Sequence, residues 1–564
     1  MKSFLALLIA LSNGLVCQNS LQWVHSFGQG RAEGVAIDQN SNSVFVGSFS
    51  GIKDFDGGTD SYTLNAPGQD AFILKSDRYG NFIWAINVGG DGAEFGNAVA
   101  VDSEGNSIVT GKFTGVSDFD PGQGQAILSS NGSYNTFAAK FGIDGHFIWA
   151  AQAAGTGYSE CTAVAVDDEG YIYMTGEFSG IVDFDPGPAT HNLSAVGQGD
   201  TYVLKLNAAG GFEWVGQIGG PGIEVARSIA FSAEGVVYIV GDFNQTVDFE
   251  PGSSVLQMTK VGGGYDSFIC KLSDAGDFIW AKQLESTSGY SWASKVVIDP
   301  NQNFYVAGQF TGSIDCDPST ASLLFQAVGE YDGFIIKFHS NGNLIWARAT
   351  QGTKQIFVHD AACDQNGNLF VGGAFAGKVD FDPGPSTYYL AAIGNVDYYD
   401  YDAFIWALDG NGQFACASSF GGPAFNYVAT LVVDKHDQLV CAGTFAGEVD
   451  FDPGQDSTKQ EGDGGETLYI SKYEKCAIIQ DVPVNDQNQI VRVFPNPCTD
   501  KLIVSSSRQV SKAMLFDFQG RTVRALTVVP SQKFVIGVDA LPRGVYLLRL
   551  NCESEYLSRK VFVE

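Results

Sequence analysis

The chain has 564 residues, of which 45% are hydrophobic, and its formal net charge is −31. This length allows more than one domain, and so large an acidic excess would be repelled by phosphate backbones, which excludes nucleic acid as an expected partner. The charge is uneven, because residues 490–564 hold 11 Lys/Arg against 6 Asp/Glu while the preceding part is strongly acidic. This change of sign predicts a domain boundary near residue 490.

Residues 1–17 predict a secretory signal peptide. Lys2 precedes the apolar run Phe4–Leu11, which is too short to span a bilayer. Its removal leaves nine cysteines, none in phase with a repeat and none in a C-x-x-C pair, so we expect few disulfides and mostly buried thiols. We also expect no transmembrane segment, since the later apolar stretches are too short.

An acidic phrase, Asp-Phe-Asp or a close variant followed by a turn, recurs seven times before residue 475. The copies are 64 to 70 residues apart and begin at Asp54, Asp118, Asp183, Asp248, Asp315, Asp380 and Asp450. A fixed period of this size predicts tandem modules, none of which can bury its apolar face alone.

Each repeat predicts four short strands and no helix. In the second repeat, Ala98–Asp102 with Ser107–Phe113 and Phe137–Phe141 with His146–Ala150 read as two β-hairpins. Four antiparallel strands repeated in tandem predict an all-β fold, the β-propeller.

The two ends of the repeat array predict that the ring closes. The strand at Leu21–Phe27 has no third strand before it, and the strand at Thr467–Tyr473 has no fourth strand after it. We therefore expect the N-terminal strand to complete the last sheet, so that residues 18–475 form seven four-stranded blades without an open edge.

Large aromatic residues recur in register and are expected to pack between the blades. They are the fourth-strand residues Trp23, Trp84, Trp149, Trp214, Trp280 and Trp346, with Cys416 in the seventh place, and the second-strand residues Phe49, Phe113, Phe178, Phe243, Phe310, Phe375 and Phe445.

The acidic phrase is the repeated constellation with the most chemical promise. Residues i and i+2 of an extended chain share a face, so two carboxylates and the carbonyls of the following turn suit Ca²⁺. The alternative is that each Asp caps its own turn. The candidate ligands are Asp54, Asp56, Asp118, Asp120, Asp183, Asp185, Asp248, Glu250, Asp315, Asp317, Asp380, Asp382, Asp450 and Asp452. The loops between blades are expected on the same face, and four of them carry Glu33, Glu94, Glu160 and Glu224.

The sequence contains no recognisable catalytic motif. Its six histidines are scattered at no metal-ligand spacing, and neither a G-x-S-x-G elbow nor H-E-x-x-H is present. Because the fifth to seventh repeats are the least regular, they are where ligand-contacting or catalytic residues are expected first. The candidates there are Trp292, Lys354, His359, Tyr398, Tyr399 and Tyr401.

The repeat resembles the SBBP-type β-propeller repeat of secreted bacterial proteins. The resemblance rests on Gly-x-Phe-x-Trp-Ala, Ala-Val-Asp-x-x-Gly-Asn and Asp-Phe-Asp-Pro-Gly, and it covers roughly residues 20–475. It implies the fold and no activity, since the family offers no shared catalytic residues to transfer.

After a linker expected at residues 476–489, residues 490–564 are similar to the type A C-terminal sorting domain of the type IX secretion system of Bacteroidota. The resemblance implies a small Ig-like β-sandwich, contact with the secretion machinery, and export through the periplasm to the cell surface or the medium. The matching pieces place the motif at Pro495, Asn496, Pro497, Gly520, Gly544, Tyr546 and Lys560.

These features together predict a secreted or cell-surface binding or adhesion module that recognises an extracellular glycan or protein without catalysis. The alternative is an extracellular polysaccharide hydrolase or lyase with residues from the fifth to seventh blades. A scaffold that binds no small ligand is a third interpretation.

Overall fold

The computed structural model describes residues 19–563 apart from 131–132, 251–254, 261, 288, 394–399, 455–456, 477–490, 495–500, 517–521, 540 and 553–554. The chain separates into two compact units, residues 18–478 and residues 1–17 with 479–564. The described residues are all-β, as predicted, and include no helix long and apolar enough to cross a membrane.

Four main strands per repeat pair antiparallel in the order first, second, third, fourth. The first three repeats contain β1 (Ser20–Ile37), β2 (Ser43–Asp54), β3 (Thr63–Ser76), β4 (Phe82–Gly90); β5 (Glu94–Val101), β6 (Ser107–Phe113), β9 (Asn135–Phe141), β10 (Phe147–Gly155); β11 (Ser159–Val166), β12 (Ile172–Phe178), β15 (Asp200–Leu206) and β16 (Phe212–Ile218). The next two contain β17 (Glu224–Ser232), β18 (Val236–Phe243), β21 (Asp266–Ser273), β22 (Phe278–Leu284); β23 (Ser291–Ile298), β24 (Phe304–Phe310), β27 (Asp332–Phe338) and β28 (Leu344–Ala349). The last two contain β30 (Ile356–Cys363), β31 (Leu369–Phe375), β34 (Asp402–Leu408), β35 (Phe414–Phe420); β36 (Asn426–Val433), β37 (Gln438–Phe445) and β40 (Thr467–Glu474).

Short strands carry the acidic phrases between the second and third main strands. They are β7 (Val116–Asp118), β8 (Ile127–Ser129), β13 (Ile181–Asp183), β14 (Asn192–Ser194), β19 (Thr246–Asp248), β20 (Gln257–Thr259), β25 (Ser313–Asp315), β26 (Leu324–Gln326), β32 (Lys378–Asp380), β33 (Tyr389–Ala391), β38 (Glu448–Asp450) and β39 (Lys459–Glu461); β29 (Gln351–Gly352) pairs with β32. In the first repeat the phrase continues β2 itself.

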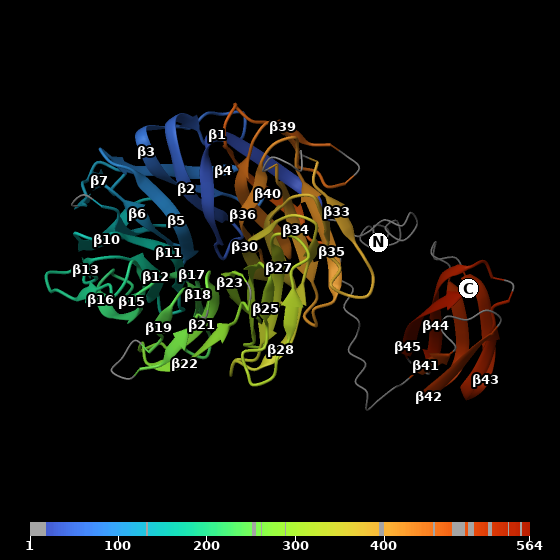
Figure 1. The fold of residues 1–564 in the computed structure, drawn as a ribbon. Coiled ribbons are helices and arrows are strands. Elements are labelled where there is room, and N and C mark those ends of the chain that lie inside the picture. The colour runs from blue at the N-terminus through green and yellow to red at the C-terminus, as the bar shows by residue number, and fades with distance from the viewer. Residues whose placement is uncertain are drawn as a thin grey trace. The chain divides into compact units, whose positions relative to one another are not determined.

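The N-terminal strand pairs with both ends of the array. Residues Ser20–Gln29 of β1 pair with β40, and Gly30–Ile37 pair with β2. The first strands of successive repeats contact one another, and β36 of the last repeat contacts β1. Figure 1 shows blue β1 beside orange β36 and β40. The strand pairing expected from the sequence between Leu21–Phe27 and Thr467–Tyr473 is therefore present.

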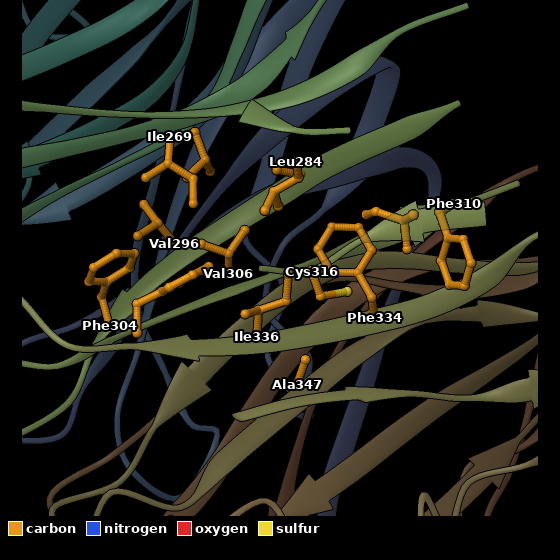
Figure 2. Packing of buried hydrophobic residues seen from close by; sticks show 14 of the residues in the cluster. Ile269, Leu284, Val296, Phe304, Val306, Phe310, Cys316, Phe334, Ile336 and Ala347 are labelled. Carbon is orange, nitrogen blue, oxygen red and sulfur yellow. The ribbon is translucent and has the colours of Figure 1, made fainter. Parts of the chain in front are cut away.

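The hydrophobic core lies between consecutive repeats. In Figure 2, Ile269 and Leu284 of the fourth repeat pack with Phe304 and Phe334 of the fifth. An equivalent cluster joins Ile470 of the seventh repeat to Phe45 of the first. Full burial of one such side chain contributes about 2 kcal/mol, so each repeat depends on its neighbour.

The fourth-strand tryptophans link neighbouring repeats and are mostly half-buried. Four of them donate the indole N–H to a turn carbonyl of the next repeat: Trp84 to Ile143 (3.0 Å), Trp149 to Ala208 (3.1 Å), Trp214 to Asp274 (3.0 Å) and Trp346 to Gly410 (3.2 Å). The tryptophans therefore pack as expected, and each indole ring lies against a hairpin turn of the next repeat at the outer edge of the array.

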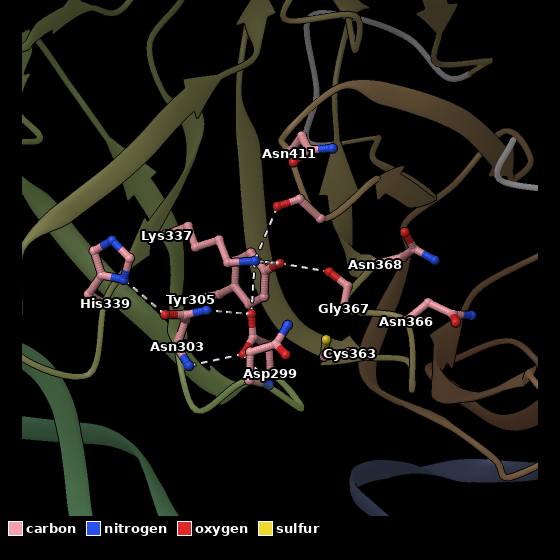
Figure 3. A network of polar contacts seen from close by, with 12 residues as sticks. Asp299, Asn303, Tyr305, Lys337, His339, Cys363, Asn366, Gly367, Asn368 and Asn411 are labelled. Atoms are coloured by element: carbon pink, nitrogen blue, oxygen red, sulfur yellow. Dashed lines mark hydrogen bonds and ion pairs between the residues drawn. The ribbon is translucent and has the colours of Figure 1, made fainter. Parts of the chain in front are cut away.

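A polar network joins the fifth and sixth repeats at the hairpin turns (Figure 3). Lys337 lies 2.8 Å from the Asp299 carboxylate and donates to the Gly410 carbonyl at 3.1 Å. Tyr305 donates to the Gly367 carbonyl at 2.7 Å. The charged Lys337 is thus neutralised and hydrogen-bonded where it is buried, which its burial requires.

One disulfide, Cys416–Cys476, fastens the end of the repeat array. Cys416 lies in β35 at the place that tryptophan holds in the other repeats, and Cys476 follows β40. Cys476, which the sequence assigned to the linker, therefore belongs to the repeat unit. Of the described residues, Cys161, Cys270, Cys316, Cys363 and Cys441 are free thiols, and burial raises the pKa of each.

The C-terminal unit contains β41 (Val491–Phe494), β42 (Lys501–Phe516), β43 (Thr522–Gly537), β44 (Gly544–Cys552) and β45 (Glu555–Val563). Strand β42 pairs irregularly with β43 between Ser505 and Lys512. Its first part pairs with β41 and its second part with β44, around a core that includes Leu502, Leu515 and Leu548. Of the sorting motif, Gly544 and Tyr546 begin β44 and Lys560 lies in β45; Pro495, Asn496, Pro497 and Gly520 lie outside the described residues.

Candidate binding site

The acidic phrases close their own turns. In the second repeat, Asp118 Oδ1 accepts the backbone N–H groups of Asp120 (3.0 Å) and Ala126 (2.9 Å), and Asp120 Oδ1 accepts that of Gly122 (2.8 Å). The same three hydrogen bonds recur in the first, third, fifth, sixth and seventh copies. In the fourth copy, the structure describes the two bonds to Asp248. The central Phe119 is fully buried. This arrangement matches the turn-capping interpretation.

The phrases lie at the outer edge of the array. β7 pairs with the end of β4, the fourth strand of the preceding repeat, through Gly89 and Asp118. Among the described residues, no three His, Cys, Asp or Glu side chains are grouped so that they could hold a metal ion. The fifth copy, with Asp315 and Asp317, lines an outer cavity of about 530 Å³ together with Glu285. The calcium hypothesis stays a prediction.

The four inter-blade glutamates occupy three different places. Glu94 and Glu224 begin β5 and β17 and are buried, and each has a local partner: Glu94 accepts the Ser117 hydroxyl (2.6 Å) and Glu224 the Gly220 N–H (2.9 Å). Glu160 lies one position later in its strand and pairs with Lys112. Glu33 lies three positions into the equivalent segment and lines the cavity described below.

Burial raises the pKa of Glu94 to about 7 and that of Glu224 to about 8. In the unfolded chain a glutamate titrates near ~4.3, so between these values the folded protein holds protons that the unfolded chain has released. Stability should therefore fall as the pH rises from about 5 to above 8. Glu224→Gln should flatten this fall and raise stability at pH 8.5 by on the order of 1 to 2 kcal/mol, with little effect at pH 5. Thermal unfolding at several pH values across this range measures the change in stability. The prediction is contradicted if the stability of the variant falls with pH as steeply as that of the unmodified protein.

Every first strand carries a β-bulge at the same place. One residue of the strand has no partner on the second strand, and it stands 21 positions before the acidic phrase. The seven bulge residues are Glu33, Asn97, Thr162, Arg227, Ser294, His359 and Ala429.

A glycine faces each bulge from the second strand. They are Gly47, Gly111, Gly176, Gly241, Gly308, Gly373 and Gly443. A Cβ atom at any of them would collide with the carbonyl oxygen of the residue two places before the bulge residue. The repeated glycine therefore permits the bulge, which redirects one side chain of each strand.

Six of the bulge residues line one cavity of about 550 Å³, which the first strands surround. The lining residues are Glu33, Thr162, Arg227, Trp292, Ser294, Gln309, Tyr331, Phe357, Val358, His359, Tyr427 and Ala429. They come from six of the seven repeats, so the lining depends on how the repeats are arranged and not on any one of them.

Four aromatic residues line this cavity: Trp292, Tyr331, Phe357 and Tyr427. They belong to a run of eight rings, which we name the aromatic arc, whose successive centroids are 5.0 to 6.2 Å apart: Tyr265, Tyr290, Trp292, Tyr331, Phe357, Tyr401, Phe425 and Tyr427. Tyr290, Trp292 and Tyr331 are stacked nearly parallel. The rings that line the cavity give it apolar aromatic surface, which suits contact with the apolar face of a ligand.

The charged residues of the lining are Glu33 and Arg227. Arg227 is paired with Asp242 (2.7 Å); the two cations whose charges act on Glu33 are also paired, Arg31 with Glu466 (2.6 Å) and Lys112 with Glu160 (2.5 Å). His359 donates through Nδ1 to the Val428 carbonyl at 2.9 Å, and burial lowers its pKa, so the ring is neutral and Nε2 is an acceptor.

Only some of the ligand-contacting or catalytic candidates predicted in the fifth to seventh repeats lie at the cavity. Trp292 and His359 line the cavity, whereas Tyr401 is buried behind it against Phe357 and Phe425. Lys354 contributes its backbone carbonyl, which accepts the N–H of Tyr331 at 3.3 Å. Tyr398 and Tyr399 lie outside the described residues.

Sequence reasoning missed Arg227, Tyr331 and Tyr427 and did not separate Glu33 from the other glutamates. The fixed offset from the acidic phrase was the available signal, because the residue 21 positions before it changes chemistry in each repeat while its surroundings recur.

Comparison with protein families supports both units. A model described as "Secretion system C-terminal sorting domain" matches residues 492–564, and one described as "Beta-propeller repeat" (SBBP) matches residues 148–177. The chain carries a type IX secretion sorting domain and an SBBP propeller repeat. It is exported by type IX secretion to the cell surface or the extracellular space.

Two curated proteins are similar in sequence to the chain. It is 23% identical over 438 residues to "Uncharacterized WD repeat-containing protein L264" of Acanthamoeba polyphaga mimivirus, which is 67% of this chain and 31% of that protein. It is 26% identical over 276 residues to "Regulatory protein FlaEY" of Caulobacter vibrioides, which is 45% of this chain and 27% of that protein. The matches thus span less than a third of either relative.

Two solved structures resemble the chain weakly. A Bacteroides caccae protein of unknown function aligns with a TM-score of 0.31 at 10% identity, over 62% of this chain and 89% of that one. Sqt1 from Chaetomium thermophilum aligns with a TM-score of 0.35 at 10% identity, over 82% of this chain and 100% of that one. Likenesses of this size carry no argument about function.

Proposed function

We propose that the seven repeats form a closed seven-bladed β-propeller and that the protein is a secreted or cell-surface module that binds a glycan in its central cavity. Closure is supported by the pairing of β1 with β40 and by the contact of β36 with β1. It places the bulge residues around one axis.

The observation that carries the binding role is the cavity of about 550 Å³ with four rings of the aromatic arc in its lining. A cavity of this size accommodates a small ligand or a few residues of a chain. Parallel aromatic faces with polar groups opposite suit a sugar ring, which has an apolar face and a hydroxyl rim.

Binding is favoured over hydrolysis by the lining. Among the described residues that line the cavity, Glu33 is the one carboxylate. Hydrolysis of a glycosidic bond generally uses two carboxyl groups on either side of the bond. A carboxylate, a neutral histidine and an ion-paired arginine suit recognition better.

Glycan-array binding followed by titration calorimetry tests this proposal. The full chain should bind at least one oligosaccharide without releasing product, and Trp292→Ala should weaken binding at least tenfold because it removes a stacking face. The control is Tyr79→Ala, which removes an exposed aromatic ring outside the cavity lining and should leave affinity unchanged. Product release from a polysaccharide, or equal losses in both variants, would contradict the proposal.

A further inference from the structure

Glu33 differs in chemistry from the other bulge residues. Three of them donate a side-chain hydrogen bond to a backbone carbonyl of the next repeat: Asn97 to Cys161 (2.9 Å), Thr162 to Ala226 (2.7 Å) and His359 to Val428 (2.9 Å). A carboxylate has no such hydrogen to donate. Among the residues that the structure describes, Glu33 has no hydrogen-bond or ion-pair partner.

The surrounding charges do not neutralise Glu33. Arg31 is bound by Glu466 in a two-point contact, Lys112 by Glu160, and Arg227 by Asp242. Each of these three cations has its own carboxylate partner. Glu33, and Glu177 near Glu160 and Arg227, add negative charge beyond these pairs, of the same sign as the whole chain, whose formal charge is −31. The field at the cavity thus attracts cations.

Glu33 is exposed and lines the cavity, so a ligand can reach its carboxylate. Partial desolvation by the surrounding protein raises the pKa of this carboxyl. The Tyr427 ring lies close to it: burial and then the Glu33 charge raise the pKa of Tyr427 to about 12. An exposed carboxylate without an intramolecular partner is available to a cationic ligand.

A carboxylate beside aromatic faces is the environment that a protonated amine prefers. The carboxylate supplies the ion pair, and the faces of Tyr427, Phe357 and Trp292 supply cation–π attraction. The acceptor Nε2 of His359 offers a further site for an ammonium hydrogen.

We propose that the glycan bound in the cavity carries a protonated amine, as in an amino sugar without its acetyl group, and that Glu33 pairs with this amine while the sugar ring stacks on the aromatic arc. This inference rests on the proposed function and names its ligand class. It assigns Glu33 the role of discriminating a charged amine from a neutral amide.

Two oligosaccharides of equal length test the inference with the full-length protein. The probes are a glucosamine tetramer with free amines and the fully N-acetylated tetramer, compared by titration calorimetry at pH 6.5. The free-amine tetramer should bind at least tenfold tighter. Glu33→Gln, which keeps shape and removes charge, should reduce this preference to less than threefold without lowering the unfolding temperature. Glu213→Gln, the same change at an exposed position of β16, should leave the preference intact.

Each outcome separates the two proposals. Equal binding of both tetramers, or a preference that survives Glu33→Gln, overturns the amine assignment and leaves glycan binding in place. Binding of neither tetramer, together with no hit among other glycans, overturns the proposed function itself. Binding of tetralysine but of neither tetramer would show that the amine belongs to a peptide, which also overturns the amino-sugar assignment.

Discussion

Deletion of residues 19–28 should prevent the repeat array from forming a stable monomer. These residues supply the outer strand of the last sheet, and Phe27 is buried while Trp23 packs against the same cluster. Each large apolar side chain contributes about 2 kcal/mol, and the unpaired edge of β40 would be free to pair with other chains. We expect loss of the cooperative thermal transition and aggregation, measured by calorimetry and size-exclusion chromatography.

The double variant Cys416→Ser, Cys476→Ser gives a graded form of this test. The disulfide closes a loop of 60 residues, and Asn19 accepts the Cys476 N–H at 2.9 Å beside it. Loop-closure entropy for this length corresponds to about 4 kcal/mol, so the variant should fold but unfold at a lower temperature. A deletion variant that remains monomeric and unfolds at the wild-type temperature would contradict the role of closure.

Gly176→Ala should destabilise the protein by about 3 kcal/mol or more. The new Cβ would collide with the Glu160 carbonyl across the bulge, and this atom is backbone that cannot move without breaking the pairing of β11 with β12. Overpacking at a rigid contact costs roughly 1 to 3 kcal/mol, and the lost bulge adds to it. Chemical denaturation measures the change in the free energy of unfolding.

Gly263→Ala is the matched control. A Cβ at Gly263 meets no heavy atom within 4 Å, so this substitution should change stability by less than about 0.5 kcal/mol. Similar effects of the two substitutions would show that the glycine facing the bulge is not required by the close carbonyl.

The turn residues show how far local pattern determines structure. The spacing Asp-x-x-Gly at a hairpin turn, as at Asp102 and Gly105, favours an Asx-type turn, and Asp102 Oδ1 accepts the N–H groups of Glu104 (3.0 Å) and Asn106 (2.9 Å). The second oxygen pairs with Lys140 at 2.8 Å, which the local pattern does not reveal because Lys140 comes from β9. Local hydrogen bonds follow from spacing, whereas ion pairs between strands depend on register.

The acidic phrase shows the limit of reasoning from residue type. Two Asp separated by one residue left two interpretations open, a shared face for a cation and the capping of the turn; in the structure the carboxylates accept backbone N–H groups, and the residue between them packs inward as expected. The turn after the phrase, not the extended strand, decides where these side chains point.

The sequence by itself determined the all-β repeat, its four strands and the pairing of the N-terminal strand with the last sheet, because these follow from a period of about 65 residues and from hydrogen bonds within each module. Only the tertiary structure decided the cavity, because Glu33, Arg227 and His359 come from different repeats and meet where the first strands surround one space. Side chains at this place face the cavity and not the core, so packing does not constrain the residue type to recur, and only the fixed offset from the acidic phrase marks their positions in the chain.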